Sequence, residues 1–220
     1  FAGGWHHFWD FSGGDMADDG IHQLDIAMML MGDPGMPTSV RTIGGRYAHK
    51  GDDSEVPDVQ VVNWDFGGRL VLTFEMTEYP KYMQKNQDTI HQNQPIPSWS
   101  MNATRVEVYG SELLLTLGRH GGGFVVQQVG GKLIEKVPSA NHPDFDHYKN
   151  FLQCLLSRQQ PNAAVSTVHA SNVLMHMGNI AHRVGNTALA YDAVTGRFDN
   201  PKANALIRPE YRKGYEIPDA

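Results

Sequence analysis

Asp18 and His22 have the residue types and the spacing of an acid/base pair. The surrounding pattern predicts a helix, and two residues that lie four apart on a helix project from one face. A carboxylate beside an imidazole orients the ring, raises its pKa and makes it a proton donor or acceptor near neutral pH. We therefore take His22 as the candidate catalytic acid/base and Asp18 as its partner.

Asp19 places a second carboxylate beside this pair, so a metal site is an alternative. Asp18, Asp19 and His22 would offer oxygen and nitrogen ligands to a cation. At most one of His6 and His7 could join them, because adjacent residues of an expected strand point to opposite faces. The sequence shows no further ligand at a diagnostic spacing. We assign no metal ligand and place Asp19 among the substrate-binding residues; its alternative role is that of a solvated acid favouring the helix dipole.

These residues open an amphipathic helix predicted from about Met16 to Met31. A turn at Gly32-Asp33-Pro34 ends it. Asp25 shares the polar side with Asp18 and is expected to be structural. The apolar stripe follows helical spacing and consists of Ile21, Leu24, Met28 and Met31.

Short alternating segments dominate the middle of the chain and predict antiparallel strands. Glycine-rich turns separate most of them, and Gly67-Gly68 predicts a tight hairpin. In segment 58–66 the apolar positions change phase between Val61 and Val62, for which we expect a β-bulge. The predicted strands span residues 39–47, 58–66, 69–77, 104–109, 113–117, 124–129 and 132–137.

Helical periodicity returns in the last third of the chain. One helix is predicted from Asp144 to Arg158, with Cys154 as a buried small hydrophobe. A second spans 166–184, where Gly178 permits close packing and Gly185 ends the helix. The apolar stripe of the first is Phe145, Tyr148, Leu152 and Leu155, and that of the second is Leu174, Met177, Ala181 and Val184.

This order of elements predicts an α+β fold: a large open, mostly antiparallel sheet with helices packed on one face, in a single domain over residues 1–220. The uncovered face of such a sheet is an association surface, so we expect a homo-oligomer formed through it. A loop at Gly118-Arg119-His120-Gly121-Gly122-Gly123 leads into another strand instead of a helix. It is therefore predicted to be a hairpin loop and not a phosphate cradle.

Residues 78–100 have little periodicity and form a polar, aromatic insertion. Insertions of this length in a compact domain are usually functional or mobile. Lys81 and Tyr82 suit contacts with a hydroxylated substrate, and the ring of Trp99 would stack on the C–H face of a sugar. An ordinary solvated loop is the alternative.

The composition excludes several classes of protein. With 18 basic and 24 acidic residues the formal charge is −6, and no basic stripe indicates nucleic-acid binding. No apolar run approaches the ~18 residues of a membrane span. The single cysteine, Cys154, has no partner for an internal disulfide, which leaves periplasm and cytoplasm both open.

The front motif resembles one in the glucose–fructose oxidoreductase / inositol dehydrogenase (Gfo/Idh/MocA) family. There, the pattern Gly-Gly-Gly-x-x-x-Asp-x-Gly-x-His-x-x-Asp opens the first long helix of the C-terminal substrate domain. The resemblance covers nearly all of the chain. The residues that carry it are Asp18, Gly20, His22 and Asp25, then Asn150-Phe151-Leu152, residues 178–185, Tyr191-Asp192, Arg197-Phe198 and the closing Arg208-Pro209-Glu210-Tyr211-Arg212.

The resemblance implies the substrate domain of a bacterial NAD(P)-dependent oxidoreductase acting on a sugar, polyol or sugar derivative. His22 would exchange a proton with the substrate, and Asp18 would orient His22 or bind the adjacent hydroxyl. NAD or NADP would be held mainly by an N-terminal dinucleotide-binding domain that is absent from this chain. The chain alone is therefore expected to bind little dinucleotide and to catalyse no redox turnover.

Other functions remain open at this point. Some relatives use bound NAD to oxidise a sugar transiently, so that a glycosidic bond breaks by elimination. A different class is a non-catalytic carbohydrate-binding or scaffolding module. Metal-assisted lyase chemistry in the isolated domain is a further alternative.

Overall fold

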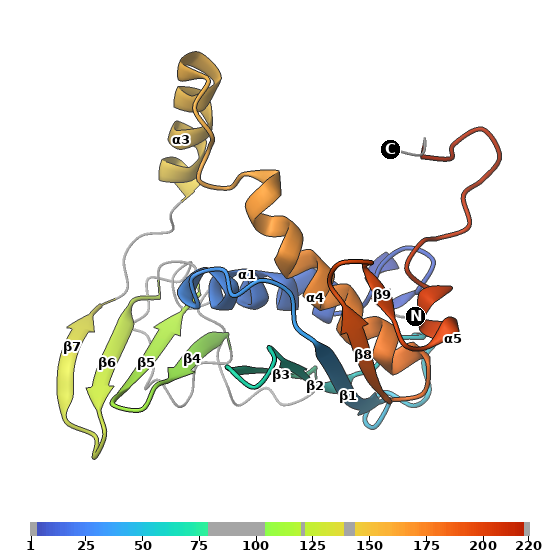
Figure 1. Ribbon diagram of the computed structural model, residues 1–220, viewed down its shortest axis with the longest axis horizontal. Helices are drawn as coiled ribbons and strands as arrows, with labels where there is room; N and C mark the ends of the chain where they lie inside the picture. Colours follow the sequence, from blue (N-terminus) through green and yellow to red (C-terminus); the bar gives the residue numbers. More distant parts are fainter. Residues whose placement is uncertain (1–3, 79–103, 120–121, 139–143, 218–220) are drawn as a thin grey trace. The chain divides into compact units, whose positions relative to one another are not determined.

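The computed structural model describes residues 4–78, 104–119, 122–138 and 144–217 (Figure 1). The chain forms two compact units, each assembled from separate stretches of sequence. The first contains Phe1–Met16, Gly35–Met76 and Leu174–Ala220, and the second contains Ala17–Pro34 and Thr77–Val173. Antiparallel sheets and helices make up both, which confirms the predicted α+β class.

A five-stranded sheet in the order β3-β2-β1-β8-β9 forms the centre of the first unit (Figure 1). Gly67 and Gly68 join β2 to β3, and their φ angles of 67° and 72° are those a tight hairpin turn requires. The predicted turn is thus confirmed. The strands are β1 (Ser39–Gly45), β2 (Val59–Asp65), β3 (Val71–Thr77), β8 (Ala188–Asp192) and β9 (Arg197–Phe198), followed by the short helix α5 (Pro201–Asn204).

The bulge expected in β2 is wrong. β1 and β2 pair without interruption from Ser39↔Asp65 to Gly45↔Val59, and buried positions alternate strictly along β2. The apparent phase shift arises because the inward position before Val62 is a polar residue, Gln60. Its buried amide nitrogen donates to the Gly178 carbonyl oxygen at 3.4 Å. A hydrogen-bonding partner on the packed helix therefore lets a polar side chain occupy a core position.

That helix is α4 (Val165–Arg183), whose C-terminal half backs the sheet of the first unit. A Cβ atom at Gly178 would lie 2.6 Å from Met16 Cε and 3.2 Å from Val62 Cγ1. The glycine is therefore what permits the predicted close packing. The buried core of this unit includes Val40, Val62, Trp64, Leu174, Met177, Ala181 and Leu189.

Asp58 fixes the loop between β1 and β2. Its carboxylate accepts backbone N–H bonds from Tyr47, Ala48 and His49 at 2.8–2.9 Å. Burial raises the pKa of Asp58, but these three donors outweigh it, and the net pKa lies below its ordinary value. The ionised carboxylate is therefore a structural anchor of the loop.

Replacing Asp58 by Asn is expected to lower the free energy of unfolding by about 1–3 kcal/mol at pH 7, because buried backbone donors lose a charged acceptor. A depressed pKa stabilises the fold above the unfolded-state pKa and ceases to do so as pH falls through the folded-state value. The difference between the two proteins should thus be constant near neutrality and shrink below about pH 4. Urea unfolding at a series of pH values measures it; a difference that grows in acid would contradict this account.

The second unit contains a four-stranded antiparallel sheet in the order β4-β5-β6-β7 (Figure 1). Helix α1 (Ile21–Leu30) packs beside β4. Successive hairpins connect the strands, as the sequence predicts. Leu24, Ala27 and Met28 form the buried face of α1. The strands are β4 (Arg105–Tyr109), β5 (Leu113–Gly118), β6 (Phe124–Gln128) and β7 (Leu133–Val137).

Helix α3 (Asp144–Ser157) forms at the predicted place, but its apolar stripe is not buried. Leu152 and Leu155 of this stripe are 59% and 48% exposed, and the neighbouring Leu156 is 89% exposed. Cys154 is half-buried instead of buried. The pattern predicts an amphipathic helix correctly, yet periodicity alone cannot say what covers the apolar face. Within the described residues, no helix is long and apolar enough to cross a membrane.

Because Leu156 is exposed, Leu156→Gln is expected to change the free energy of unfolding by less than about 0.5 kcal/mol. The same substitution should reduce binding of a hydrophobic dye to the folded chain, because it removes apolar surface from α3. Thermal unfolding and dye fluorescence check the two statements. A loss of stability comparable to that of a core substitution would show that α3 packs against the chain.

Candidate functional site

The Asp18–His22 segment is not one uniform α-helix. Met16–Gly20 is a π-helical segment, and α1 begins only at Ile21. The wider i→i+5 turn is rare and often occurs at functional sites. Asp18 and Asp19 therefore lie on the π-helical segment, while His22 lies in the first turn of α1.

The three predicted site residues differ in exposure. Asp18 and His22 are exposed on the second unit, whereas Asp19 is half-buried. Asp19 Oδ1 accepts a hydrogen bond from Arg119 Nη1 at 2.5 Å, which forms an ion pair across 100 positions of sequence. The sequence does not single out Arg119 as a site residue; the available signal is an arginine in the glycine-rich stretch 118–123 that follows the apolar strand 113–117.

The pKa of His22 lies below its ordinary value, although the neighbouring carboxylates raise it as expected. Partial burial of the ring is the largest cause, and the Arg119 guanidinium adds to it; Asp19, Asp18 and Asp25 act in the opposite direction. The imidazole is therefore mostly neutral at pH 7. A neutral imidazole can accept a proton, which is the state a general base requires.

Asp25 has a structural contact, as the sequence predicts. Its Oδ1 atom accepts a hydrogen bond from the Ser171 hydroxyl at 2.8 Å. Ser171 is buried on α4, so this bond ties α1 to the N-terminal part of α4 within the second unit. The bond positions α1, which carries His22.

The glycine-rich stretch 118–123 lies between two paired strands, β5 and β6. β5 and β6 pair as an antiparallel hairpin across it, which confirms the predicted hairpin loop. Gly123 has a φ of 75°, and a Cβ atom there would collide with the backbone of Val137 and Pro138. This glycine serves strand packing, and no helix N-terminus follows it to receive a phosphate. The described part of this stretch therefore connects two strands and does not have the strand–loop–helix arrangement of a phosphate cradle.

The remaining predictions concern the substrate contacts of the insertion and a possible metal site. Lys81, Tyr82 and Trp99 lie outside the described residues. Among the residues that are described, no group of three or more His, Cys, Asp or Glu side chains is arranged to hold a metal ion. His6 and His7 lie on a short 3₁₀ helix instead of the expected strand.

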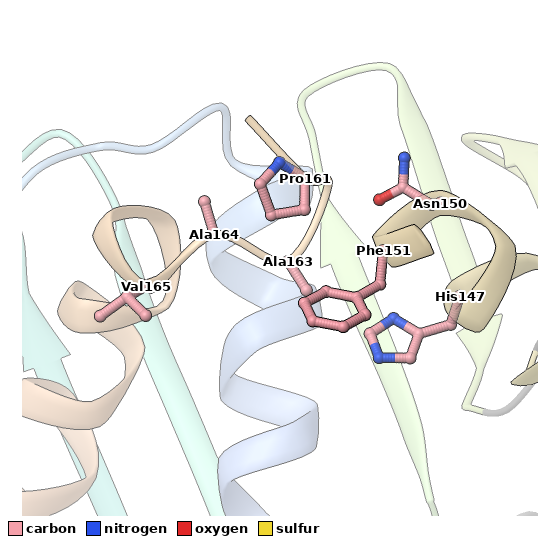
Figure 2. Close-up of a pocket in the computed structure, with 7 residues that line it drawn as sticks. All are labelled: His147, Asn150, Phe151, Pro161, Ala163, Ala164 and Val165. Atoms are coloured by element: carbon pink, nitrogen blue, oxygen red, sulfur yellow. The ribbon is translucent and has the colours of Figure 1, made fainter. Parts of the chain in front are cut away.

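A cavity of about 340 Å³ lies between α3 and the segment that follows it (Figure 2). Figure 2 shows Phe151 and His147 of α3 facing Pro161 and Ala163 across it. Its surface is almost entirely apolar, and the Asn150 side chain already accepts the Asn162 N–H at 2.9 Å. Such a lining lacks the convergent polar groups that a hydroxyl-rich ligand needs. The described lining residues are His147, Asn150, Phe151, Pro161, Ala163, Ala164 and Val165.

Comparison of the sequence with family models defines the class of protein. Residues 129–217 match the model described as "Oxidoreductase family, C-terminal alpha/beta domain". Residues 1–116, which include the Asp18–His22 segment, match the "GFO/IDH/MocA C-terminal domain". The chain therefore belongs to the Gfo/Idh/MocA family of oxidoreductases and corresponds to its C-terminal domain. The search of curated protein sequences gives no match.

Solved structures share the fold at low sequence identity. The aldose-aldose oxidoreductase of Caulobacter crescentus, complexed with glycerol, has a TM-score of 0.59 at 16% identity, covering 86% of this chain and 51% of that one. The WlbA dehydrogenase of Bordetella pertussis, in complex with NADH and UDP-GlcNAcA, has a TM-score of 0.51 at 17% identity, covering 87% and 49%. This chain thus spans about half the length of the structures it matches.

Proposed function

We propose that this chain is the substrate-binding domain of an NAD(P)-dependent oxidoreductase acting on a sugar, polyol or sugar derivative. The observation that carries the proposal is the exposed pair formed by Asp18 of the π-helical segment and His22 in the first turn of α1, within a matched Gfo/Idh/MocA domain. A neutral, accessible imidazole beside a carboxylate suits proton exchange with a hydroxyl group. The similar structures hold UDP-GlcNAcA and glycerol, which are hydroxylated molecules.

In this proposal His22 accepts the proton of the substrate hydroxyl during oxidation and returns it during reduction. Asp18 orients the ring or binds the neighbouring hydroxyl. Asp19, Lys81, Tyr82 and Trp99 are the proposed substrate contacts, Trp99 by stacking on the sugar ring.

The cofactor would be NAD or NADP, which supplies the hydride acceptor when it is bound. Because the glycine-rich stretch of this chain leads into a strand and not into a helix N-terminus, we assign the binding of the dinucleotide to an N-terminal dinucleotide-binding domain. On its own the chain should bind NADH weakly and catalyse no turnover. Isothermal titration of the chain with NADH tests this assignment, and tight binding would contradict it.

The proposed oligomer uses the face of the five-stranded sheet opposite α4. Ile43 and Val71 on that face are 60% and 65% exposed, and Ile43 pairs with Val61 across the strands. An apolar strip on an uncovered sheet face is a common association surface. Light scattering should show a dimer or larger assembly, and Ile43→Lys should dissociate it; a monomeric parent chain would contradict the proposal.

The central experiment uses the protein that joins this chain to a dinucleotide-binding domain. NADH formation from NAD⁺ is followed with a panel of aldoses, polyols, nucleotide sugars and glycosides. The proposal expects NADH from at least one of these substrates and its loss in His22→Asn. Free aglycone without NADH would favour the glycoside-cleaving alternative. Sugar binding that is unchanged in both His22→Asn and Asp18→Asn, without any turnover, would favour a non-catalytic module.

A further inference from the structure

Arg119 is an almost fully buried cation directed at the candidate site. Its side chain is 7% exposed, and its guanidinium binds the Asp19 carboxylate on the π-helical segment at 2.5 Å. A buried charge of this kind is costly unless it is paired and hydrogen-bonded. The pairing with Asp19 is therefore a strong local constraint on the segment that carries Asp18.

The backbone around Arg119 is held by the sheet of the second unit. Its N–H group donates to the Thr104 carbonyl at 3.2 Å, and its carbonyl accepts the Gly122 N–H at 3.1 Å. Gly118, the residue before it, donates to the Gly123 carbonyl at 3.0 Å. Thr104 is also buried. The guanidinium is therefore presented from a hydrogen-bonded strand end.

The charges around His22 explain why such a cation matters. Asp18 and Asp19 on the π-helical segment and Asp25 on α1 all act on the imidazole with negative charge, and Arg119 acts with positive charge. Three carboxylates alone would favour the imidazolium, which cannot act as a base. The Arg119 cation offsets this effect and fixes the direction of the Asp19 carboxylate.

We propose that Arg119 is a positioning residue of this site: through Asp19 it anchors the π-helical segment and sets the charge balance around His22. It acts through these two residues and not by contact with the reacting atoms. The positioning itself is a property of this chain. Only its consequence for turnover rests on the proposed function.

The test measures the titration of His22 in this 220-residue chain by NMR of labelled imidazole rings, with the signal assigned by its loss in His22→Asn. Arg119→Gln should raise the pKa of His22, Arg119→Lys should leave it close to the parent value, and Asp19→Asn should lower it. In the double variant Arg119→Gln/Asp19→Asn, the pKa of His22 should lie closer to the parent value than in either single variant. Amide exchange at residues 17–20 should quicken in Arg119→Gln, because the anchor of that segment is lost.

Arg105→Gln is the matched control, because Arg105 also forms an ion pair in this sheet, with Glu107 at 2.8 Å. It should leave the His22 titration and the exchange at residues 17–20 unchanged. The proposal is overturned if Arg119→Gln does not move the His22 titration, or if Arg105→Gln moves it equally. If Arg119→Gln does not fold, the Asp19→Asn variant provides the test. An unchanged His22 titration in Asp19→Asn also overturns the proposal.

Turnover separates this inference from the proposed function. In the protein that contains the dinucleotide-binding domain, Arg119→Gln should lower kcat about 10-fold or more with a smaller change in KM, and Arg119→Lys should restore part of it. If no sugar is oxidised while the NMR responses occur as described, the proposed function fails and the positioning role stands. If sugars are oxidised and the NMR responses are absent, the positioning role fails alone.

Discussion

His22→Asn is expected to lower kcat for sugar oxidation by about 10²–10⁴-fold, the usual contribution of a general acid/base. Asn has nearly the size and the hydrogen-bonding capacity of the imidazole, but it cannot take up a proton. Because His22 lies exposed at the start of α1, the substitution should leave the thermal unfolding of the chain unchanged. Steady-state kinetics of NADH formation measures the loss.

The pH dependence of kcat/KM provides a second test of the role of His22. The neutral imidazole is the active base, and its pKa lies below the ordinary histidine value. For oxidation, kcat/KM should therefore be flat from neutral pH downward to about pH 6.5 and should fall in more acid solution. His22→Asn should remove this acid limb.

His182→Asn is the matched control for the kinetic experiment. His182 lies in the last turn of α4 and hydrogen-bonds through Nδ1 to Asn186 at 2.8 Å, in the first unit. Its loss should change kcat by less than about twofold, since it has no part in the proposed proton transfer. An equal fall in both variants, or full activity in His22→Asn, would remove His22 from the catalytic role.

Trp64→Ala should produce the largest loss of stability, about 3–5 kcal/mol. Trp64 is fully buried in β2, where it lies opposite Val40 of β1. Removing the indole takes a large apolar group from the core between the sheet and α4 and leaves a cavity that neighbouring side chains fill only in part. Chemical denaturation of the folded chain measures the effect.

Ile43→Thr, one strand away on the uncovered face, provides the comparison. Ile43 is 60% exposed, so its replacement by another β-branched residue should cost less than about 1 kcal/mol. Similar losses at Trp64 and Ile43 would mean that the two faces of the sheet are not distinguished as the burial pattern indicates. Measuring both below the concentration at which the chain associates keeps association out of the comparison.

The strands were predictable because alternation along a sheet with one packed face is a local property of the sequence. β3 shows it directly: Leu72, Phe74 and Met76 turn inward between Val71, Thr73 and Glu75. The same alternation rule gives a wrong bulge at Gln60. This polar side chain points inward because it donates a hydrogen bond to the Gly178 carbonyl of α4, more than one hundred residues away. A pattern rule for apolar positions cannot detect a polar core residue whose partner is remote in sequence.

The site was predictable only in part, for a similar reason. The spacing of Asp18 and His22 and the resemblance of their motif identify a helical segment here, although α1 itself begins at Ile21 and not near Met16. The π-helical form of Met16–Gly20 and the pairing of Asp19 with Arg119 were not visible, because both depend on tertiary contacts. Helix α3 shows a related limit. Its periodicity identifies the apolar face, but it does not identify what packs against that face.

Deuterium tracing tests whether this protein transfers a hydride from a hydroxylated substrate to NAD⁺ with His22 as the base. A sugar or polyol carrying deuterium on the oxidised carbon is incubated with NAD⁺ and the protein that joins this chain to a dinucleotide-binding domain. Deuterium should appear on the nicotinamide of NADH, and His22→Asn should slow its appearance at least 100-fold, as for loss of a general base. Label that never reaches the nicotinamide with any hydroxylated substrate, or that arrives equally fast without His22, would contradict it.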